Sequence, residues 1–484
     1  MEDTTPDAMP DCESKAGSEG TSRRGFMKML GLGGISLASM VGAPIEDVLA
    51  ETTSKVNRYS NPSDLKITDM RVAVIGRIPF RVPIIRIDTN QGISGFGEVR
   101  DDGDKRYALI LKSRLLGQNP CNVERLFRLI RQFGNHGRQG GGVSGVETAL
   151  WDLAGKAYGV PVYQMLGGKY RDRVRLYADT AGANDPHVFA RRMKETRVDR
   201  GYTALKMDIG IELLRNIPGA LVNTRAHAPV GEYALQSQYS RNPGEYGQIE
   251  HPFTRIQITE TGLDAIEEYV RVMRETIGYE IPLGIDHTGH FDVDEAIKLA
   301  RRLEPYTLAY MEDLVAWNWF DKWKAITDAT TTPTMTGEDI FGLEGGFKEL
   351  IDRQAVSMVH PDLGSAGGIL ETKRIGDYAE RGGLAMYLHY AGSPVGFFAS
   401  VHAAAATYNF VALEHHSVEN DNWYSLIPSD TVVFDQGYVP VPDKPGLGVE
   451  LNEDAIKELL IEGEGYFEPT PEWNEAQSWD RLWS

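Results

Sequence analysis

The chain has 484 residues, of which 42% are hydrophobic and 25% are charged, a balance that suits a globular protein with a sizeable core. Its formal net charge of −19 argues against a nucleic-acid-binding surface, which needs clustered lysine and arginine. The two cysteines, Cys12 and Cys121, are too few for a disulfide framework or a cysteine-based metal site.

The N-terminus has the features of an export leader. Paired arginines in TSRRGFMK, residues 21–28, precede a weakly apolar run that is too short and too glycine-rich to span a membrane. This pattern resembles a twin-arginine signal. We expect residues 1–50 to be a leader, 51–65 to be a linker, and the exported protein to be periplasmic or extracellular and not bound to a membrane. The alternative is a disordered basic tail.

Residues 66–180 predict an α+β capping domain. Alternation of apolar and polar residues indicates three antiparallel strands, and two shorter helical patterns and one long amphipathic helix follow them. The predicted elements are the strands 66–76, 81–89 and 93–100 and the helices 105–116, 123–133 and 143–159.

After this domain, short apolar strands recur, and each ends in polar residues and precedes a helical pattern. The eight strands are VRLYADT, TALKMDIG, IPLGIDHT, LAYMEDL, TPTMTGEDI, AVSMVHPDLG, LAMYLHYA and FVALEHH. The polar residues that end the last six are separated by 24 to 27 residues, which is room for one strand, one helix and two loops. Residues 181–425 therefore predict an α/β barrel of the TIM type, whose catalytic groups lie at the carboxyl ends of the strands.

Two segments depart from this period. Lys206 and Asp286 are 80 residues apart, so an insertion of polar, Gly-, Pro- and Tyr-rich sequence lies at 210–262. It is either a lid over the site or a surface or oligomer-contact loop. The last segment, 426–484, predicts two short strands, at TVVF and GYVPV, and packing against the capping domain.

Three successive barrel strands end in Asp286, Glu312 and Glu338. Because neighbouring strands lie about 5 Å apart, these carboxylates converge, and a hard divalent cation offsets their repulsion. A single acid at a strand end is more often a helix cap or a surface charge, but three in register favour a Mg²⁺ site.

The next two strands place Asp362 beside His389. A carboxylate next to an imidazole fixes its tautomer and raises its basicity, which suits a general base. Glu414 ends the eighth strand and is a candidate to hydrogen-bond a substrate carboxylate as it gains charge.

Three stretches, PDLGSAGG (361–368), LHYAGSP (388–394) and ETALWDLAGKAYGVPVYQMLGG (147–168), resemble the mandelate racemase group of the enolase superfamily. The resemblance implies an N-terminal α+β cap that the C-terminal segment completes, a (β/α)7β barrel, and Mg²⁺ on the three carboxylates. It also implies abstraction of the proton α to a carboxylate, with the ion stabilising the enediolate. Relatives are often homo-oligomers, so we expect one here.

One departure from the family decides the expected reaction. Two-base members often carry Lys-x-Lys on the second strand, whereas this chain has Lys206-Met207-Asp208. Lys206 is expected to contact the substrate carboxylate or the metal-bound oxygen, and Asp208 becomes a candidate substrate contact. We therefore predict a dehydratase of a small sugar acid, with a racemase, epimerase or cycloisomerase as the alternative.

Sugar-acid dehydratases of this family often have a histidine two residues after the first metal ligand. This chain has Thr288 there, between His287 and His290. Because strand alternation points His287 away from the ion, His290 is the preferred general acid and His287 a substrate contact; the alternative is that both only support the site or lie on the surface. By resemblance, cap loops carry the further candidate substrate contacts Arg81, His136 and Arg138.

Overall fold

The computed structural model describes residues 61–134, 140–180, 182–214, 217–222, 257–286, 288–289 and 291–475. All of them belong to one compact unit, Arg58–Ser484. The predicted leader and most of the linker lie outside the described residues, so export stays a prediction. Among the described helices, none combines the length and the apolar character that crossing a bilayer requires.

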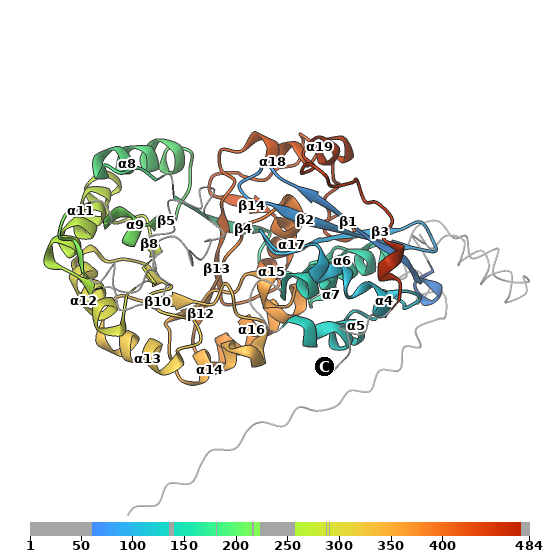
Figure 1. Ribbon diagram of the computed structural model, residues 1–484, viewed down its shortest axis with the longest axis horizontal. Coiled ribbons are helices and arrows are strands. Elements are labelled where there is room, and N and C mark those ends of the chain that lie inside the picture. The colour runs from blue at the N-terminus through green and yellow to red at the C-terminus, as the bar shows by residue number, and fades with distance from the viewer. Residues whose placement is uncertain are drawn as a thin grey trace, which may run out of the picture. The chain divides into compact units, whose positions relative to one another are not determined.

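The capping domain begins with an antiparallel sheet in the order β1-β2-β3 (Figure 1). Its strands are β1 (Ile67–Ile75), β2 (Val82–Thr89) and β3 (Ser94–Glu98). The helices of the cap are α3 (Arg106–Leu109), α4 (Lys112–Leu115), α5 (Val123–Ile130), α6 (Gly141–Tyr158) and α7 (Val162–Met165). The helix predicted over 105–116 is therefore two separate turns, while the long amphipathic helix is α6.

Helix α6 joins the cap to the barrel, and Glu147 explains how. Its carboxylate accepts hydrogen bonds from the backbone N–H groups of Ile369 (2.7 Å) and Leu370 (3.1 Å), at the start of α16 (Ile369–Arg381). It also accepts one from Trp151 Nε1 at 2.6 Å. A carboxylate at a helix N-terminus satisfies donors that have no partner within the helix. The ETALW motif therefore connects the two parts of the molecule.

Strand β3 lies very close to α6 because glycines face each other there. A Cβ added to Gly97 would overlap the Gly145 carbonyl oxygen and lie 3.0 Å from Ala149 N. We expect Gly97→Ala to destabilise the protein by about 1–3 kcal/mol, because the helix must move off the sheet. Denaturant unfolding measures this loss. Gly182→Ala is the matched control, because an added Cβ there meets nothing within 4 Å; equal stability of the two variants would contradict this packing.

The barrel contains eight parallel strands, and pairing of β13 with β4 closes it. In sheet order they are β4 (Arg173–Ala178), β5 (Leu205–Asp208), β8 (Leu283–Asp286), β9 (Tyr310–Glu312), β10 (Thr334–Thr336), β11 (Met358–Val359), β12 (Ala385–Leu388) and β13 (Phe410–His415). All eight predicted strands are present, so the predicted barrel is confirmed. Because β4 belongs to it, the barrel begins before the predicted boundary at residue 180.

A helix follows each of the first seven barrel strands, and these helices surround the strands (Figure 1). They are α8 (Pro186–Met193), α11 (Glu260–Ile277), α12 (Val293–Leu303), α13 (Phe320–Ala329), α14 (Phe347–Asp352), α16 and α17 (Pro394–Ala405). Shorter turns in the same region are α9 (Ile211–Leu214), α15 (Leu363–Ala366) and α18 (Asp421–Ser425). This order matches the (β/α)7β arrangement that the family resemblance implies.

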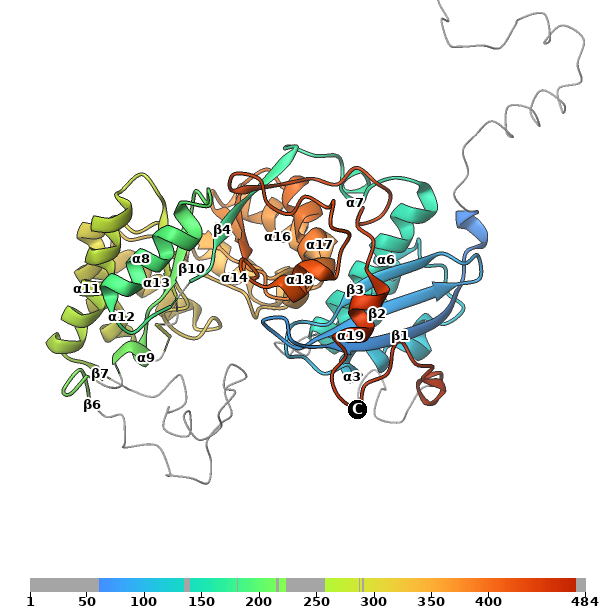
Figure 2. The same ribbon diagram turned by 90° about the horizontal axis from the view of Figure 1, so that it is seen from above.

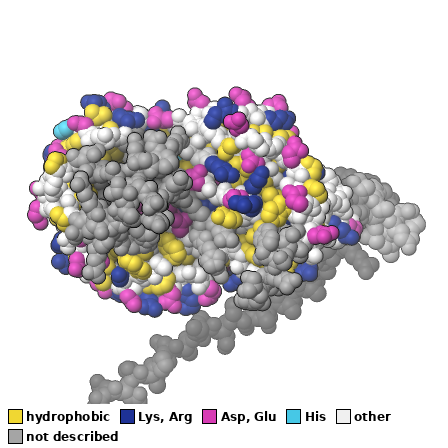
Figure 3. Space-filling view, in the orientation of Figure 1, with side chains coloured by type: hydrophobic (Ala, Val, Ile, Leu, Met, Phe, Trp, Pro, Cys, Tyr) yellow, Lys and Arg dark blue, Asp and Glu magenta, His cyan; other side chains and the backbone are white. Residues whose placement is uncertain are grey.

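The insertion leaves and returns through a short antiparallel pair, β6 (Leu221–Val222) and β7 (Gln257–Ile258). Residues 223–256 lie outside the described residues, so its two expected roles stay open. Acidic and basic side chains are interspersed over the described part of the face seen in Figure 3.

The C-terminal segment packs on the cap, as predicted. Gly76 N donates to Leu459 O at 2.9 Å, and Ile461 N donates to Val74 O at 3.0 Å. The segment contains β14 (Tyr438–Pro440), antiparallel to β4, and α19 (Glu453–Glu458), which lies near β1 (Figure 2). The strand predicted at TVVF (431–434) does not form; only the bridge between Asp435 and Tyr438 precedes β14.

Candidate active site

The carboxyl ends of the barrel strands bring the predicted acids together in a buried place. Asp286 is the last residue of β8 and Glu312 the last residue of β9, and their exposed fractions are 6% and 0%. Asp208, at the end of β5, lies beside Asp286 in the parallel register. The regular spacing in the sequence therefore predicted that these acids meet at the strand ends; their roles stay predictions.

Three carboxylates form the tightest acidic group among the described residues. Oxygen atoms of Asp286, Glu312 and Asp313 lie within 4.8 Å of one another. Burial, followed by the charge of Asp286, raises the pKa of Glu312 well above its usual range. Burial and the charges of Glu338 and Asp286 do the same to the pKa of Asp313. Burial and mutual repulsion therefore both disfavour the charged forms of these acids, and Lys206 offsets this only in part.

Glu338, which the sequence predicts as the third metal ligand, lies at the edge of this group. Its Oε2 is 2.9 Å from His389 Nε2, and its Oε1 is 3.6 Å from Arg100 Nη2. Asp313, which adopts a positive φ of 46°, takes the third place in the group. The assignment of Glu338 as a ligand stays a prediction.

Lys206 is the cation that faces these acids. Its ammonium group lies 2.6 Å from Glu414 Oε1, 3.1 Å from Asp286 Oδ2 and 3.9 Å from Glu312 Oε2. Although burial alone would lower it, the charges of Glu312 and Glu414 hold the pKa of Lys206 well above its usual value. The side chain is therefore positively charged, as a contact for a substrate carboxylate requires.

The predicted base and its partner are in contact. His389 Nδ1 lies 2.6 Å from Asp362 Oδ2, which fixes the tautomer and leaves Nε2 facing the carboxylate group. Burial lowers the pKa of His389, but Glu338 and Glu414 outweigh it and raise the pKa to about 10. Arg100, which comes from the cap, forms a buried ion pair with Asp362.

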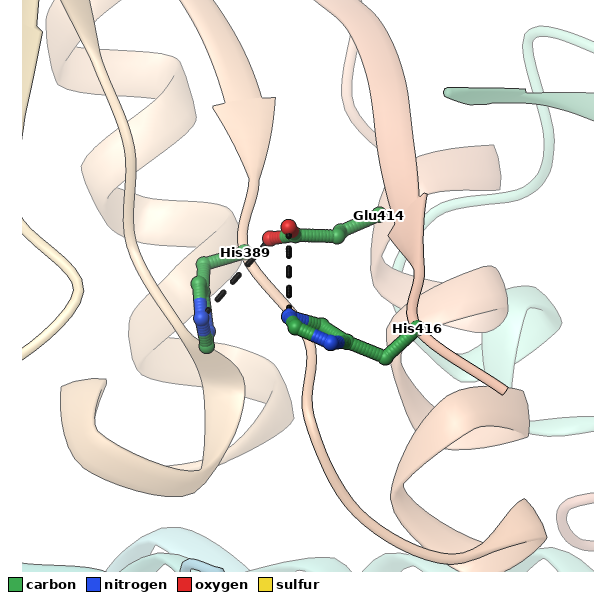
Figure 4. A group of neighbouring side chains, drawn as sticks. All are labelled: His389, Glu414 and His416. Carbon is green, nitrogen blue, oxygen red and sulfur yellow. Dashed lines mark ion pairs between the residues drawn. The ribbon is translucent and has the colours of Figure 1, made fainter. Parts of the chain in front are cut away.

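Glu414 lies between two imidazoles, as Figure 4 shows. Its Oε2 is 3.7 Å from His389 Nε2, and its Oε1 is 3.3 Å from His416 Nε2. Tyr177 also donates a hydrogen bond to Oε2 at 2.8 Å. One nitrogen of each imidazole and one oxygen of Glu414 lie within 4.8 Å of one another. The site therefore has a second histidine opposite the predicted base.

The acidic group fits a hard divalent cation, whereas the histidine group does not. Asp286, Glu312 and Asp313 offer only oxygen ligands, the set that Mg²⁺ prefers. Among the described residues, neither oxygen of buried Glu312 accepts a hydrogen bond of good geometry, and its nearest polar neighbour is His360 Nδ1, 2.9 Å from Oε1. The histidine group offers two imidazoles and one carboxylate, a set that Mg²⁺ does not favour, and the Lys206 ammonium lies closer to Glu414, at 2.6 Å, than to Asp286, at 3.1 Å.

Comparison with known proteins decides the family. The Enolase C-terminal domain-like family matches residues 188–455. The Mandelate racemase / muconate lactonizing enzyme N-terminal domain matches residues 54–167. The chain belongs to the mandelate racemase and muconate lactonizing enzyme group of the enolase superfamily. The resemblance seen in three short stretches of sequence is therefore confirmed.

Several members of this superfamily are similar over most of their length. A D-xylonate dehydratase of Haloferax volcanii is 32% identical over 433 residues, which cover 88% of this chain and 96% of that protein. A D-galactonate dehydratase of Pectobacterium atrosepticum is 28% identical, over 79% of this chain and 92% of that protein. The solved structure of a mandelate racemase/muconate lactonizing enzyme-like protein from Rubrobacter xylanophilus has a TM-score of 0.71 and 29% identity. The matched region covers 84% of this chain and 100% of the Rubrobacter xylanophilus chain.

The structure describes only some of the predicted substrate contacts. Arg81 is exposed, and it lines a cleft of the cap together with Arg77 and Asp102. The loop that carries it does reach the barrel site, but through Phe80, whose ring packs edge-on against His416 at 5.4 Å. The remaining candidates lie outside the described residues and stay predictions: His136, Arg138, His287 and His290.

Four residues of the site were missed in the sequence. Arg100 comes from the cap, so the regular spacing of the barrel strands does not identify it. Asp313 directly follows a predicted ligand, which was the available signal. His416 had no assigned role, although it directly follows a barrel strand as Asp179 does, and the two form an ion pair at 2.9 Å.

Proposed function

We propose that this superfamily member is a Mg²⁺-dependent dehydratase of an aldonate-type sugar acid that yields a 2-keto-3-deoxy acid and water. It is an enzyme of the hydro-lyase class, like the dehydratases to which it is similar. The observation that carries the proposal is the His389–Asp362 pair, whose Nε2 contacts Glu338 at the same strand ends that carry the buried group of Asp286, Glu312 and Asp313. A base beside a cation site is what removal of a proton α to a carboxylate needs.

The residues have distinct roles in this reaction. A cation at the acidic group would offset the charge of Glu338, which otherwise raises the pKa of His389, and the neutral Nε2 then accepts the α-proton. Asp362 holds the ring and stabilises the imidazolium that forms. The Lys206 ammonium binds a substrate carboxylate oxygen, and Glu414 orients Lys206 from the other side at 2.6 Å. The acidic group of Asp286, Glu312 and Asp313 would hold Mg²⁺, which would supply positive charge against the negative charge that develops on the substrate carboxylate. The carbon–oxygen bond at the β-carbon then breaks, and the electron pair of the enediolate forms the new double bond.

The isomerase alternative is less compatible with the geometry. A racemase or epimerase places two bases on opposite faces of one carbon, at a separation of roughly 6 Å, twice the reach of a hydrogen bond. The nitrogens of His389 and His416 lie within 4.8 Å of each other. Asp208 also stands where a lysine base would be needed on the second strand.

One assay separates these reactions. The purified protein is incubated with a panel of sugar acids and Mg²⁺ in D₂O, and keto acid is measured as its semicarbazone. We expect keto acid from at least one sugar acid. Deuterium at the α-carbon without keto acid from any of them would instead indicate an isomerase.

Removal of the metal is expected to abolish turnover. Because the buried acids repel the negative charge of the enediolate, keto-acid formation should stop after treatment with EDTA and return with added Mg²⁺. Titration with Mg²⁺ while keto acid is followed measures this. Full activity in the chelated protein would contradict the assigned cation site.

A further inference from the structure

A dehydratase needs an acid as well as a base, because hydroxide is a poor leaving group. At the position where sugar-acid dehydratases of this family often carry a histidine, this chain has Thr288. Thr288 is fully buried, and its hydroxyl donates to the backbone oxygen of Glu312 at 3.4 Å. A threonine hydroxyl is too weak an acid to deliver a proton near neutral pH. His290, the acid that the sequence favours, lies outside the described residues, so a described acid has to be sought in another part of the site.

His416 is held in place by three groups. Its Nδ1 lies 2.9 Å from Asp179 Oδ2, and Asp179 follows the end of the first barrel strand, β4. Its Nε2 lies 3.3 Å from Glu414 Oε1, and the Phe80 ring packs edge-on against the imidazole. The side chain keeps 19% of its surface exposed, so it borders open space. Closure of the barrel between β13 and β4 therefore creates a second histidine–aspartate pair.

Building on the dehydratase function proposed above, we propose that His416 is the general acid that protonates the departing β-hydroxyl, and that Asp179 positions it. The His416–Asp179 pair then has the complementary role to the His389–Asp362 pair. Figure 4 shows both imidazoles directed toward Glu414 from different sides. The two carboxylates around His416 hold its pKa well above the usual value even though burial lowers it. The imidazole is thus protonated and ready to donate.

The short separation of the two imidazoles fixes the course of the elimination. Their rings are 6.1 Å apart at the centroids, with nitrogens within 4.8 Å. Base and acid on one face of the substrate reach a hydrogen and a hydroxyl on neighbouring carbons, whereas an anti elimination needs them on opposite faces. The structure therefore favours syn elimination.

The proton balance closes over one turnover. His389 gains the α-proton, and His416 loses a proton to the hydroxyl, which leaves as water. Conversion of the enol to the keto acid then adds a proton to the former β-carbon and releases the proton of the α-hydroxyl. His389 supplies the first of these protons, and His416 regains the second. No oxidant or reductant takes part, and the products are one keto acid and one water.

A substrate whose leaving group needs no proton isolates this role. Fluoride departs as the anion, so a 3-deoxy-3-fluoro sugar acid should bypass His416 while still requiring His389. We expect His416→Asn to lower keto-acid formation from the hydroxy acid about 10²–10⁴-fold, the usual contribution of general acid catalysis. Fluoride release from the fluoro analogue should change less than about threefold, well under that contribution. Asp179→Asn should show the same selectivity with a smaller loss.

Exchange and control variants complete the test. Deuterium exchange at the α-carbon of recovered hydroxy acid should persist in His416→Asn, because His389 is intact. The matched control is His187→Asn, an exposed histidine on α8 that should leave both substrates unaffected. Retained fluoride release also shows that the variant is folded. If His416→Asn does not fold, His416→Gln is used in its place.

The outcomes separate the two proposals. If His416→Asn loses activity on the hydroxy acid and on the fluoro analogue equally, or keeps full activity on both, the assignment of His416 as the acid is wrong. If the wild-type protein forms keto acid from no sugar acid, the proposed dehydratase function itself fails.

Discussion

The variant His389→Asn is expected to form keto acid about a thousandfold more slowly than the wild type, within the range for loss of a general base. His389 is the imidazole that Asp362 orients and whose Nε2 lies 2.9 Å from Glu338 Oε2. Asparagine keeps a polar side chain of similar reach but cannot accept the α-proton. Measurement of keto-acid formation and of α-deuterium exchange in D₂O should show that both are lost together.

This joint loss distinguishes His389 from His416, whose replacement should spare exchange. The surface variant His187→Asn serves as control, since its side chain is exposed on α8. The fold of His389→Asn is monitored by circular dichroism. If this variant exchanged the α-proton at the wild-type rate, another group would be the base, and the assignment of the His389–Asp362 pair would be wrong.

The fold and the core of the site could be predicted because both repeat along the chain. Six residues recur at a nearly constant interval: Asp286, Glu312, Glu338, Asp362, His389 and Glu414. A parallel barrel brings the ends of its strands to one rim. The spacing alone thus placed buried acids beside a histidine–aspartate pair. Neighbours such as Asp208 and Asp286 meet because their strands pair in register.

The residues that were missed meet through contacts that no local pattern encodes. Asp179 and His416 come together only when the first and last barrel strands pair, with Glu414 opposite Tyr177. Arg100 reaches Asp362 from the end of a cap strand, so only docking of the cap on the barrel reveals it. For Asp313, the positive φ of 46° turns the residue toward the acidic group; strand alternation would point it away from Glu312.

The variant Lys206→Met is expected to be less stable than the wild type and to regain part of that stability when Mg²⁺ is added. In the structure the Lys206 ammonium is the buried positive charge nearest to Glu414 and Asp286, at 2.6 and 3.1 Å. Methionine fills similar space without charge, so the buried carboxylates lose their counter-ion. Removing one partner of a buried ion pair costs about 3–5 kcal/mol, and we expect that loss in the free energy of unfolding of the chelated protein.

Magnesium should restore part of this stability, because a divalent cation that binds only the folded state stabilises it by mass action. The charge that Lys206 provides to Asp286 and Glu312 would then come from the ion. Urea unfolding with EDTA and with Mg²⁺ measures the difference. The matched control is Lys112→Met in the cap, where a buried ammonium lies 2.6 Å from Asp69 Oδ1. That variant should lose a similar free energy of unfolding. Added Mg²⁺ should stabilise it no more than it stabilises the wild type. If Mg²⁺ restored the stability of both lysine variants equally, the cation would bind elsewhere than among Asp286, Glu312 and Asp313. If it restored only the stability of Lys206→Met, the ion would bind the same carboxylates that the lysine neutralises.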